Sequence, residues 1–536
     1  MTDPRCPVDI PFADVQGNIL TGYGRLGFPF GRFGLVSVRD AAAGRAFVEK
    51  LRSRVTTAAR WPSERKKKIL PAGRVEVTRP KVTLNLAFTF YGLHALGVPT
   101  RTLRGMPDEF IDGMAGRCAI LGDDTKENPR SGWDPVWLPA ERGKAPHILV
   151  MLNAQDNGDG TPVPELAALC KEIADLCDKP GKLELLGGHR GPDDKWQHLE
   201  ALRDSRGYPC AKEHFGYTDG ISDPVFEGQY AQAQENERSV GFGASDGQGN
   251  WRPIAAGEFL LGWPDEAQEI AGAAMPLDFS RNGTFVAYRK LYQDIDAFQS
   301  WVAATAAELQ KVWDIADAEE AKETLLAKMA GRWSDGVPLM VAPTYAEWEA
   351  FNKRCPPDEG DGIRDDSERQ RALVNFLYRE DPDGVKCPMT SHIRRSNTRD
   401  MLDPRAGDAA KGRMGSALNN RRRIVRRGLP YGKAGDEDHG VIMLVVCTNL
   451  QRQFEFVQQQ WINYGLDSNA GNDPCPVIGN HDEHAKFTIA VDPDSGRPPF
   501  IATGLKQWVQ TRGGDYFFMP SMTALRMIGT GVVDPT

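Results

Sequence analysis

One order of strands and helices occurs twice in this chain, and it limits the possible folds more than any other feature. In the first half, four alternating or apolar segments are predicted strands: "FGLVSV" (33–38), "KVTLNLAFTF" (81–90), "HILVML" (147–152) and "KLELL" (182–186). One helix is predicted between the first two strands and another between the last two. Strand, helix, strand, strand, helix, strand is the order of a ferredoxin-like unit.

The two helices of this unit are predicted from apolar residues that recur at helical spacing. The first lies within residues 40–59 and the second within 166–177. Their apolar positions are Phe47, Val48, Leu51 and Val55 in the first helix, and Leu166, Leu169, Cys170, Ile173, Leu176 and Cys177 in the second.

The second half of the chain repeats the same order. Strands are predicted at 284–291, 422–428, 440–448 and 515–519, and helices at 295–309 and 451–463. The predicted fold class is therefore α+β, with two ferredoxin-like units that each combine an antiparallel sheet with peripheral helices.

Long polar insertions interrupt both units. The segments 101–146, 190–255, 352–386 and 400–420 are too long for simple connections, so we expect them to be functional or disordered. The first unit ends near residue 255. This predicts an N-terminal domain of residues 1–255 and a C-terminal domain of residues 256–536, in agreement with a length too great for one ordinary core.

Composition argues against several classes of partner. The net charge of -8 and the sequence pI near 5.7 argue against a dedicated nucleic-acid binder, which needs a basic face. No run of eighteen apolar residues occurs, so a membrane span is not expected. The first twenty residues lack the pattern of a signal peptide, and the nine cysteines contain no Cys-x-x-Cys pair. We therefore expect a cytoplasmic protein without a disulfide framework.

The segment "CPMTSHIRRSNTRD" (387–400) places His392 among Arg394, Arg395 and Arg399. A positive field keeps an imidazole neutral, and a neutral imidazole is a good metal ligand. A basic segment is also typical of a nucleic-acid patch, and a single histidine is usually a core or loop residue. On these residues alone, all three interpretations stay open.

Three further segments carry polar residues with more than one interpretation. "HDEH" (481–484) offers His481 and His484 as metal ligands, but without a third ligand a polar loop is favoured. "GYTDG" (216–220) has the chemistry of a turn. "NNRRRIVRRGLPYG" (419–432) carries five arginines, typical of a solvated or phosphate-binding face, and any arginine that points inward needs an anionic partner.

Taken together, these segments resemble one family. "GYTDG" is similar to the Gly-x-x-Asp-Gly motif of the dye-decolorizing (DyP-type) haem peroxidases, and "HIRRSNTR" (392–399) to their His-Ile-Arg-Arg-x-Asn-Pro-Arg segment. "IVRRGLPYG" (424–432) resembles the arginine strand of the family. Similar segments continue over nearly the whole chain: "VQGNILTGYG" (15–24), "GEFLLGWPDE" (257–266), "NGTFVAYRKL" (282–291), "GRWSDGVPL" (331–339) and "FEFVQQQWIN" (454–463).

The resemblance implies a pair of ferredoxin-like units in which the second holds most of a haem b (iron protoporphyrin IX). The N-terminal domain would carry the distal aspartate motif. The long insertions resemble those of the larger, non-secreted branch of the family.

On the proximal side, the resemblance makes His392 the ligand of the haem iron. Arg394, Arg395 and Arg399 would neutralise the haem propionates. Glu455, on the predicted helix 451–463, would accept a hydrogen bond from the other ring nitrogen of His392 and so raise its basicity.

On the distal side, the resemblance gives Asp219 the task of moving a proton between the two peroxide oxygens. Arg426 would stabilise the negative charge that grows as the O–O bond breaks. Met443 stands where many relatives carry an aromatic residue over the haem, and Thr398 replaces the proline of the Asn-Pro-Arg segment.

The function implied is a haem peroxidase that reduces hydrogen peroxide and oxidises bulky aromatic, phenolic or dye-like donors by one-electron steps. The alternative is a haem-binding protein of the same fold with little turnover or with another haem reaction. The presence of Asp219 and Arg426 with His392 favours the enzyme. No nucleic-acid or membrane partner is expected, and the oligomeric state is left open.

Overall fold

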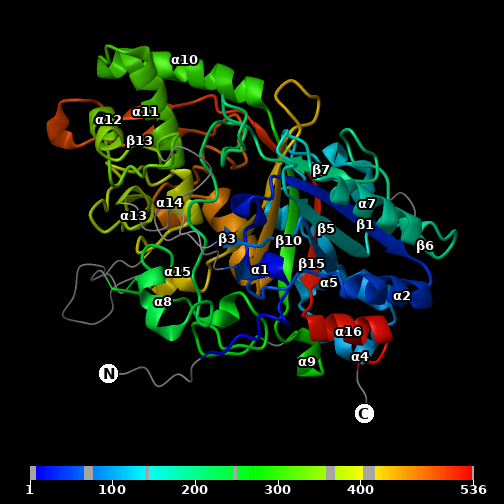
Figure 1. Ribbon diagram of the computed structural model, residues 1–536. Helices are drawn as coiled ribbons and strands as arrows, with labels where there is room; N and C mark the ends of the chain where they lie inside the picture. The colour runs from blue at the N-terminus through cyan, green and yellow to red at the C-terminus, as the bar shows by residue number, and fades with distance from the viewer. Residues whose placement is uncertain are drawn as a thin grey trace.

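The computed structural model of the protein describes residues 8–64, 76–138, 144–245, 250–271, 273–357, 368–402 and 417–533. Its main sheet has the strand order β11-β12-β10-β15-β4-β5-β1-β6, and β7 (Gln197–Glu200) pairs with β1 beside β6. The strands of both halves lie at the centre of the molecule (Figure 1), with α2 and α7 beside the first half. The predicted α+β class with antiparallel strands is confirmed.

The first half contains the six predicted elements in the predicted order. They are β1 (Phe30–Val38), α2 (Ala41–Arg52), β4 (Val82–Phe88), β5 (Ile148–Ala154), α7 (Pro164–Cys177) and β6 (Leu183–Leu185). In space the strands follow the order β4-β5-β1-β6, so the first strand pairs with the third and fourth.

The second half has the same arrangement. Its elements are β10 (Thr284–Gln293), α10 (Ile295–Trp313), β11 (Val425–Tyr431), β12 (Gly440–Cys447), a helical segment made of η6 (Leu450–Glu455) and η7 (Val457–Ile462), and β15 (Val509–Met519). Its strands follow the order β11-β12-β10-β15, which matches the order of the first half strand by strand.

Two local features of the second half differ from the sequence prediction. The strand predicted at 422–428 begins at Val425, and the side chains of Arg422 and Arg423 just before it donate to backbone carbonyls of other segments. The helix predicted at 451–463 is wound as a π-helix, with hydrogen bonds five residues apart. The side chains of this helix therefore do not face where an α-helical wheel would put them.

One sheet, rather than two, joins the halves of the molecule. Phe518 of β15 pairs with Phe88 of β4, so the last strand of the second half lies next to the first half. At the other end, β7 contacts β11, and the sheet therefore curls back on itself. The sequence pattern did not predict this junction.

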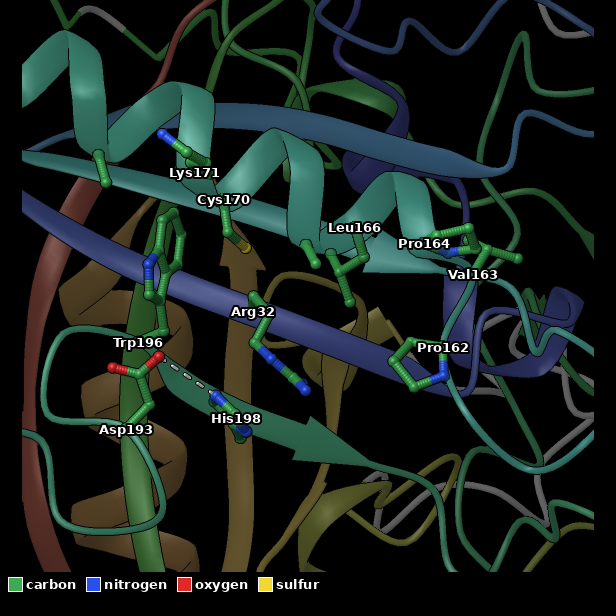
Figure 2. A pocket seen from close by; sticks show the side chains of 12 residues that line it. Arg32, Pro162, Val163, Pro164, Leu166, Cys170, Lys171, Asp193, Trp196 and His198 are labelled. Atoms are coloured by element: carbon green, nitrogen blue, oxygen red, sulfur yellow. Dashed lines mark ion pairs between the residues drawn. The ribbon is translucent and has the colours of Figure 1, made fainter.

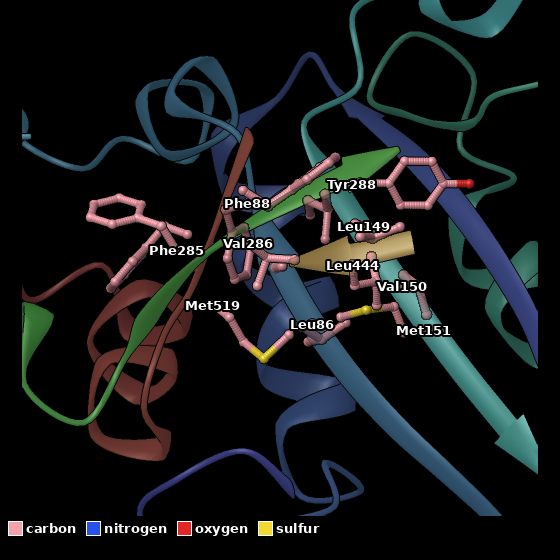
Figure 3. Close-up of a cluster of buried hydrophobic side chains, with 14 of the residues drawn as sticks. Leu86, Phe88, Leu149, Val150, Met151, Phe285, Val286, Tyr288, Leu444 and Met519 are labelled. Carbon is pink, nitrogen blue, oxygen red and sulfur yellow. The ribbon is translucent and has the colours of Figure 1, made fainter. Parts of the chain in front are cut away.

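One hydrophobic cluster contains residues from both sides of the junction. Figure 3 shows Leu86 and Phe88 of β4 together with Val286 of β10 and Met519 of β15, all fully buried. The strand β5 is a nearly continuous apolar run because both of its faces are covered, and β4 is buried along most of its length although it carries Thr83 and Asn85. The domain boundary near residue 255 stays a prediction.

The long insertions contain ordered helices in the parts that the structure describes. Examples are α5 (Asp108–Gly116), α8 (Gln232–Arg238) and α13 (Glu368–Val374). Three helices that begin outside the insertions, α14 (His392–Ser396), α11 (Ala318–Ala330) and α12 (Tyr345–Arg354), lie near α13 in Figure 1. Across the ranges given above, no helix is both long and apolar enough to cross a bilayer.

Candidate active site

His392 is the first residue of α14 and is half-buried. Burial lowers the pKa of its imidazole to about 4, and the charges of Arg426 and Arg395 act in the same direction while Asp219 opposes them. The ring is therefore neutral at pH 7. Its Nδ1 lies 3.4 Å from the sulfur of Cys475, and Nε2 has no hydrogen-bond partner within the described ranges.

Asp219 is held on a loop that is ordered by its own polar groups. The carboxylate of Glu213 accepts hydrogen bonds from the backbone N–H groups of Phe215 and Tyr217, both at 2.9 Å. The Asp219 backbone N–H donates to the Ala211 carbonyl at 2.7 Å. Gly216 has a φ of 96°, a left-handed value that favours glycine, so the turn predicted from "GYTDG" is present.

Arg426 forms an ion pair with Asp219. Its Nη1 donates to Asp219 Oδ2 at 3.3 Å, and its Nη2 donates to Oδ1. Burial raises the pKa of Asp219, but attraction to Arg426 and hydrogen bonds from Arg426 and Gly220 outweigh this effect, and the net shift is downward. The pKa of Arg426 is raised, mainly by Asp219. Both groups are charged at neutral pH.

The pair is partly exposed. The side chains of Arg426 and Asp219 are 42% and 41% exposed, and burial is the largest single influence on the pKa of Asp219. Asp219 and His392 each shift the pKa of the other, which places them close together. The structure thus brings Asp219, Arg426 and His392 to one site.

The neighbouring arginine, Arg427, belongs to the opposite face of β11. It donates to the carbonyls of Asn18 and Ile19 and pairs with Asp223 at 2.9 Å. It is 7% exposed, so its guanidinium stabilises the protein interior. Arg426 is therefore the arginine of this strand that can reach a substrate.

Met443 lies on the same face of the sheet as Arg426. Arg426 pairs with Val445 of β12, and Gly428 pairs with Met443. Alternate residues of a strand share a face, and directly paired residues do too. Met443 is only partly buried, and its place over the haem stays a prediction.

The three arginines that follow His392 are bound differently from one another. Every side-chain nitrogen of Arg394 already donates to protein, including Nη1 to Asp381 at 2.8 Å, so the structure does not support its predicted propionate contact. Arg395 donates to the carbonyls of Trp461, Tyr464 and Asp473.

Arg399 keeps free donors. It gives one hydrogen bond to the Phe376 carbonyl at 2.8 Å and lies over the Phe376 ring at 3.9 Å. Its Nε and Nη2 are buried without a partner in the part of the chain that the structure describes. A buried guanidinium needs an anion, so Arg399 is the best placed of the three to receive a carboxylate.

The predicted contact between Glu455 and His392 is wrong. Glu455 is 2% exposed and accepts hydrogen bonds from Arg117, at 2.9 and 2.7 Å, and from the Tyr516 hydroxyl at 2.8 Å. Glu455 is the last residue of the π-helical η6 and faces Tyr516 of β15. The sulfur of Cys475 lies beside His392 instead. The sequence held no periodic signal for it, because Cys475 follows His392 by 83 residues in an irregular segment.

The "HDEH" segment does not form a metal site. His481 is buried, and its two ring nitrogens lie 2.8 Å from the carbonyl oxygens of Lys506 and Cys475. His484 is exposed. Among the residues whose positions are described, no group of three or more His, Cys, Asp or Glu side chains could hold a bare metal ion.

A separate pocket of about 380 Å³ lies between α7 and strands β1 and β7. Figure 2 shows Arg32 and His198 near one end of it, with an ion-pair distance of 3.6 Å between His198 and Asp193. Its walls are Pro162, Val163, Pro164, Leu166, Ala167, Cys170, Ala174 and Trp196. None of the motif residues lines it, so it is distinct from the site at His392.

Comparison with protein families gives two matches. Residues 14–161 match the DyP dimeric alpha+beta barrel domain, and residues 400–472 match the C-terminal part of Dyp-type peroxidases. Both matches are to DyP-type peroxidases. The second match includes Arg426, and the first includes β1, β4 and β5 of the joined sheet.

Relatives of this DyP-type peroxidase extend over most of its length. Peroxidase 2 of Mycetinis scorodonius is 26% identical over 97% of this chain and 88% of its own. The multifunctional dye peroxidase DyP2 of an Amycolatopsis species is 28% identical over 59% of this chain and 61% of its own. The fold is shared with a fungal DyP-type peroxidase from Auricularia auricula-judae at a TM-score of 0.69, with 20% identity over 98% of this chain and 99% of that one. The predicted enzyme class, a haem peroxidase, is confirmed.

Proposed function

We propose that the space between His392 and the Asp219–Arg426 pair is where this peroxidase reduces hydrogen peroxide. One observation carries the proposal: an ionised carboxylate and a guanidinium form an ion pair whose charges act on the neutral imidazole of His392. A carboxylate that can take a proton, next to a fixed cation that can stabilise an oxyanion, suits cleavage of an O–O bond.

The residues present fit a haem, which we infer to be haem b. His392 is neutral and offers a free Nε2, as an iron ligand must. Arg399 offers two buried donors to a propionate, and Arg395 offers one, its Nε. When bound, the haem would supply the redox-active iron. We also interpret each half of the sheet as a ferredoxin-like unit, with the haem held mainly by the second.

Asp219 and Arg426 would have different roles in the reaction with peroxide. Asp219, ionised before peroxide arrives, would accept a proton from one peroxide oxygen and deliver it to the other. Arg426 cannot lose its charge at working pH and would stabilise the departing oxygen. The ion pair keeps each group in position, since Arg426 holds Asp219 through two donors.

Bulky aromatic, phenolic or dye-like donors are the proposed reducing substrates, oxidised one electron at a time. In support, a solved relative with 22% identity and a TM-score of 0.67 is a dye-decolorizing peroxidase in complex with 2,6-dimethoxyphenol. A cytoplasmic location is also proposed, and the free thiols of the eight cysteines within the described ranges support it. Cys6 lies outside those ranges.

The test is haem binding followed by reaction with peroxide. The purified chain should bind haem with a Soret band that shifts on addition of hydrogen peroxide, and it should then oxidise 2,6-dimethoxyphenol. His392→Ala should lose stable haem binding. Arg39→Leu is a suitable control, because the Arg39 side chain is 41% exposed, close to the 42% of Arg426, and its partner Glu184 lies on β6, far from His392 in the sequence. A bound haem whose spectrum ignored peroxide would favour the alternative, a haem-binding protein with little turnover.

A further inference from the structure

Cys475 contacts the proximal histidine from a rigid position. Its sulfur lies 3.4 Å from His392 Nδ1, and the residue is completely buried. Its backbone N–H donates to the Ile462 carbonyl at 2.7 Å, and its carbonyl accepts from the Gly479 N–H at 2.9 Å. The ring of His481 lies 2.8 Å from the same carbonyl. These contacts fix the sulfur at the end of η7.

The direction of the hydrogen bond follows from which nitrogen is free. Nδ1 faces the sulfur, and Nε2 has no partner within the described part of the chain. If Nε2 is to bind iron, the ring proton must be on Nδ1, because a neutral imidazole carries only one. Nδ1–H then donates, and the sulfur accepts.

The surroundings of Cys475 favour this direction. Burial raises the pKa of the Cys475 thiol, but Arg395 and the backbone N–H groups of Val477, Ile478 and Gly479 act against that rise, so they favour electron density on the sulfur. The other charged groups that act on His392 are Arg426 and Asp219, both on the distal side. No described carboxylate contacts Nδ1, since Glu455 is bound to Arg117 and Tyr516.

We propose that Cys475 is a positioning residue for the haem ligand: its sulfur accepts the Nδ1–H of His392, selects the tautomer with a free Nε2, and fixes the ring orientation. This rests on the proposed function of His392. Sulfur is a weak acceptor, so it withdraws little of the Nδ1 proton. The ligand should therefore be less basic than a histidine bound to a carboxylate, and the haem should have a higher reduction potential than a carboxylate partner would give.

The first experiment examines the full-length protein without haem. With ¹⁵N-labelled histidine, the ring nitrogen shifts of His392 report which nitrogen carries the proton. We expect the Nδ1–H form in the parent and in Cys475→Ser, whose hydroxyl can also accept. Cys475→Ala should show a mixture of the two forms. A parent in the Nε2–H form, or an alanine variant with the parent's shifts, would overturn the proposal.

The second experiment uses the haem-loaded protein and reads the iron–histidine stretch by resonance Raman together with the reduction potential. Cys475→Asp should raise the stretching frequency and lower the potential, because a carboxylate is a stronger acceptor and Arg395 can balance its charge. Cys475→Ala should lower haem affinity by about ten-fold, the low end of the range for such partners. Equal frequencies and potentials in parent, Ala and Asp variants would contradict the contact.

The matched control is Cys447→Ala. Cys447 is equally buried but lies on β12 within the sheet core, so its removal leaves a similar cavity without touching His392. In Cys447→Ala, the His392 tautomer, the iron–histidine stretching frequency and the haem reduction potential should equal those of the parent. The two proposals fail in different ways. A parent protein that binds no haem refutes the proposed function, whereas the tautomer of His392 in the haem-free protein still decides the role of Cys475.

Discussion

Arg426 and Asp219 hold one another in place, yet their removal should have unequal effects on the reaction with peroxide. Arg426→Leu removes the fixed charge that stabilises the departing oxygen, and such donors contribute about 2.7 to 4 kcal/mol, or roughly a hundred-fold to a thousand-fold in rate. Asp219→Asn should cost less, because water can relay the proton. Stopped-flow mixing with peroxide measures both rates. If Arg426→Leu reacted at the parent rate, Arg426 would not be the distal cation.

The pH dependence should follow the carboxylate. The pKa of Asp219 is lowered from its ordinary value of 3.8 despite burial, through attraction to Arg426. Asp219 accepts a proton only when ionised, so activity is lost as pH falls through that lowered pKa and is retained above it. The rate with peroxide should therefore stay near its maximum down to about pH 4. An acid limb centred near 6.5 would instead indicate a histidine as the base.

Most residues of the distal site were predictable because each belongs to a local motif. Asp219 lies in a turn whose glycines need left-handed backbone, and Arg426 lies in an alternating strand beside Arg427. Cys475 was not predictable, since its role depends on a loop folding against α14. The different hydrogen-bond partners of Arg394, Arg395 and Arg399 were not predictable either, because they depend on which carbonyls and carboxylates surround each guanidinium.

At the level of elements, Glu455 fastens the π-helical segment to the sheet. Arg426, Val445, Ala287 and Tyr516 form one row across four strands, so Tyr516 is three strand spacings, or about 14 Å, from Arg426. Glu455 binds Tyr516 at the far end of this row. This explains why a residue predicted to tune the haem ligand has a structural task instead.

Glu455→Gln should therefore reduce stability and leave the reduction potential unchanged. The substitution breaks a buried ion pair, because Glu455 and Arg117 are 2% and 17% exposed, and the expected loss is roughly 3 kcal/mol in the free energy of unfolding. Denaturant titration and a potentiometric titration measure the two quantities. Glu184→Gln, at an exposed pair, is the control. If Glu455→Gln shifted the reduction potential and left the free energy of unfolding unchanged, the predicted contact between Glu455 and His392 would be supported instead.

The elements themselves were largely predictable from periodicity. The strands beginning at Phe30, Val82, Ile148 and Thr284 overlap the apolar runs that predicted them. The winding of η6 and η7 was not predictable, because the apolar residues of "FEFVQQQWIN" suit an α-helix equally well. Only the packing of Phe454 against Tyr516 and of Glu455 against Arg117 distinguishes the two windings.

At the scale of the whole molecule, Phe518 connects the two halves. It is completely buried, pairs with Phe88 across the junction, and lies 5.9 Å from the rings of Phe279 and Phe285. Phe518→Ala should cost about 3 to 5 kcal/mol. Hydrogen exchange should then quicken together in β4 and β10, which belong to different halves.

The control for this substitution is Phe500→Ala. Phe500 is 5% exposed and belongs to a separate hydrophobic cluster beside α10. Its removal should quicken exchange near β14 (Phe500–Ala502) and leave β4 at the parent rate. Faster exchange in β10 alone after Phe518→Ala would mean that the halves are stable independently of the junction.

The position of β15 has a consequence for how the protein is made. This strand lies in the middle of the sheet, between β10 and β4, but it follows the other seven strands of the main sheet order along the chain. A ribosome therefore releases both halves before it releases the strand that unites them. Until then, the edges of β4 and β10 are unpaired and prone to aggregation. Nascent chains stalled before residue 509 should therefore depend on chaperones.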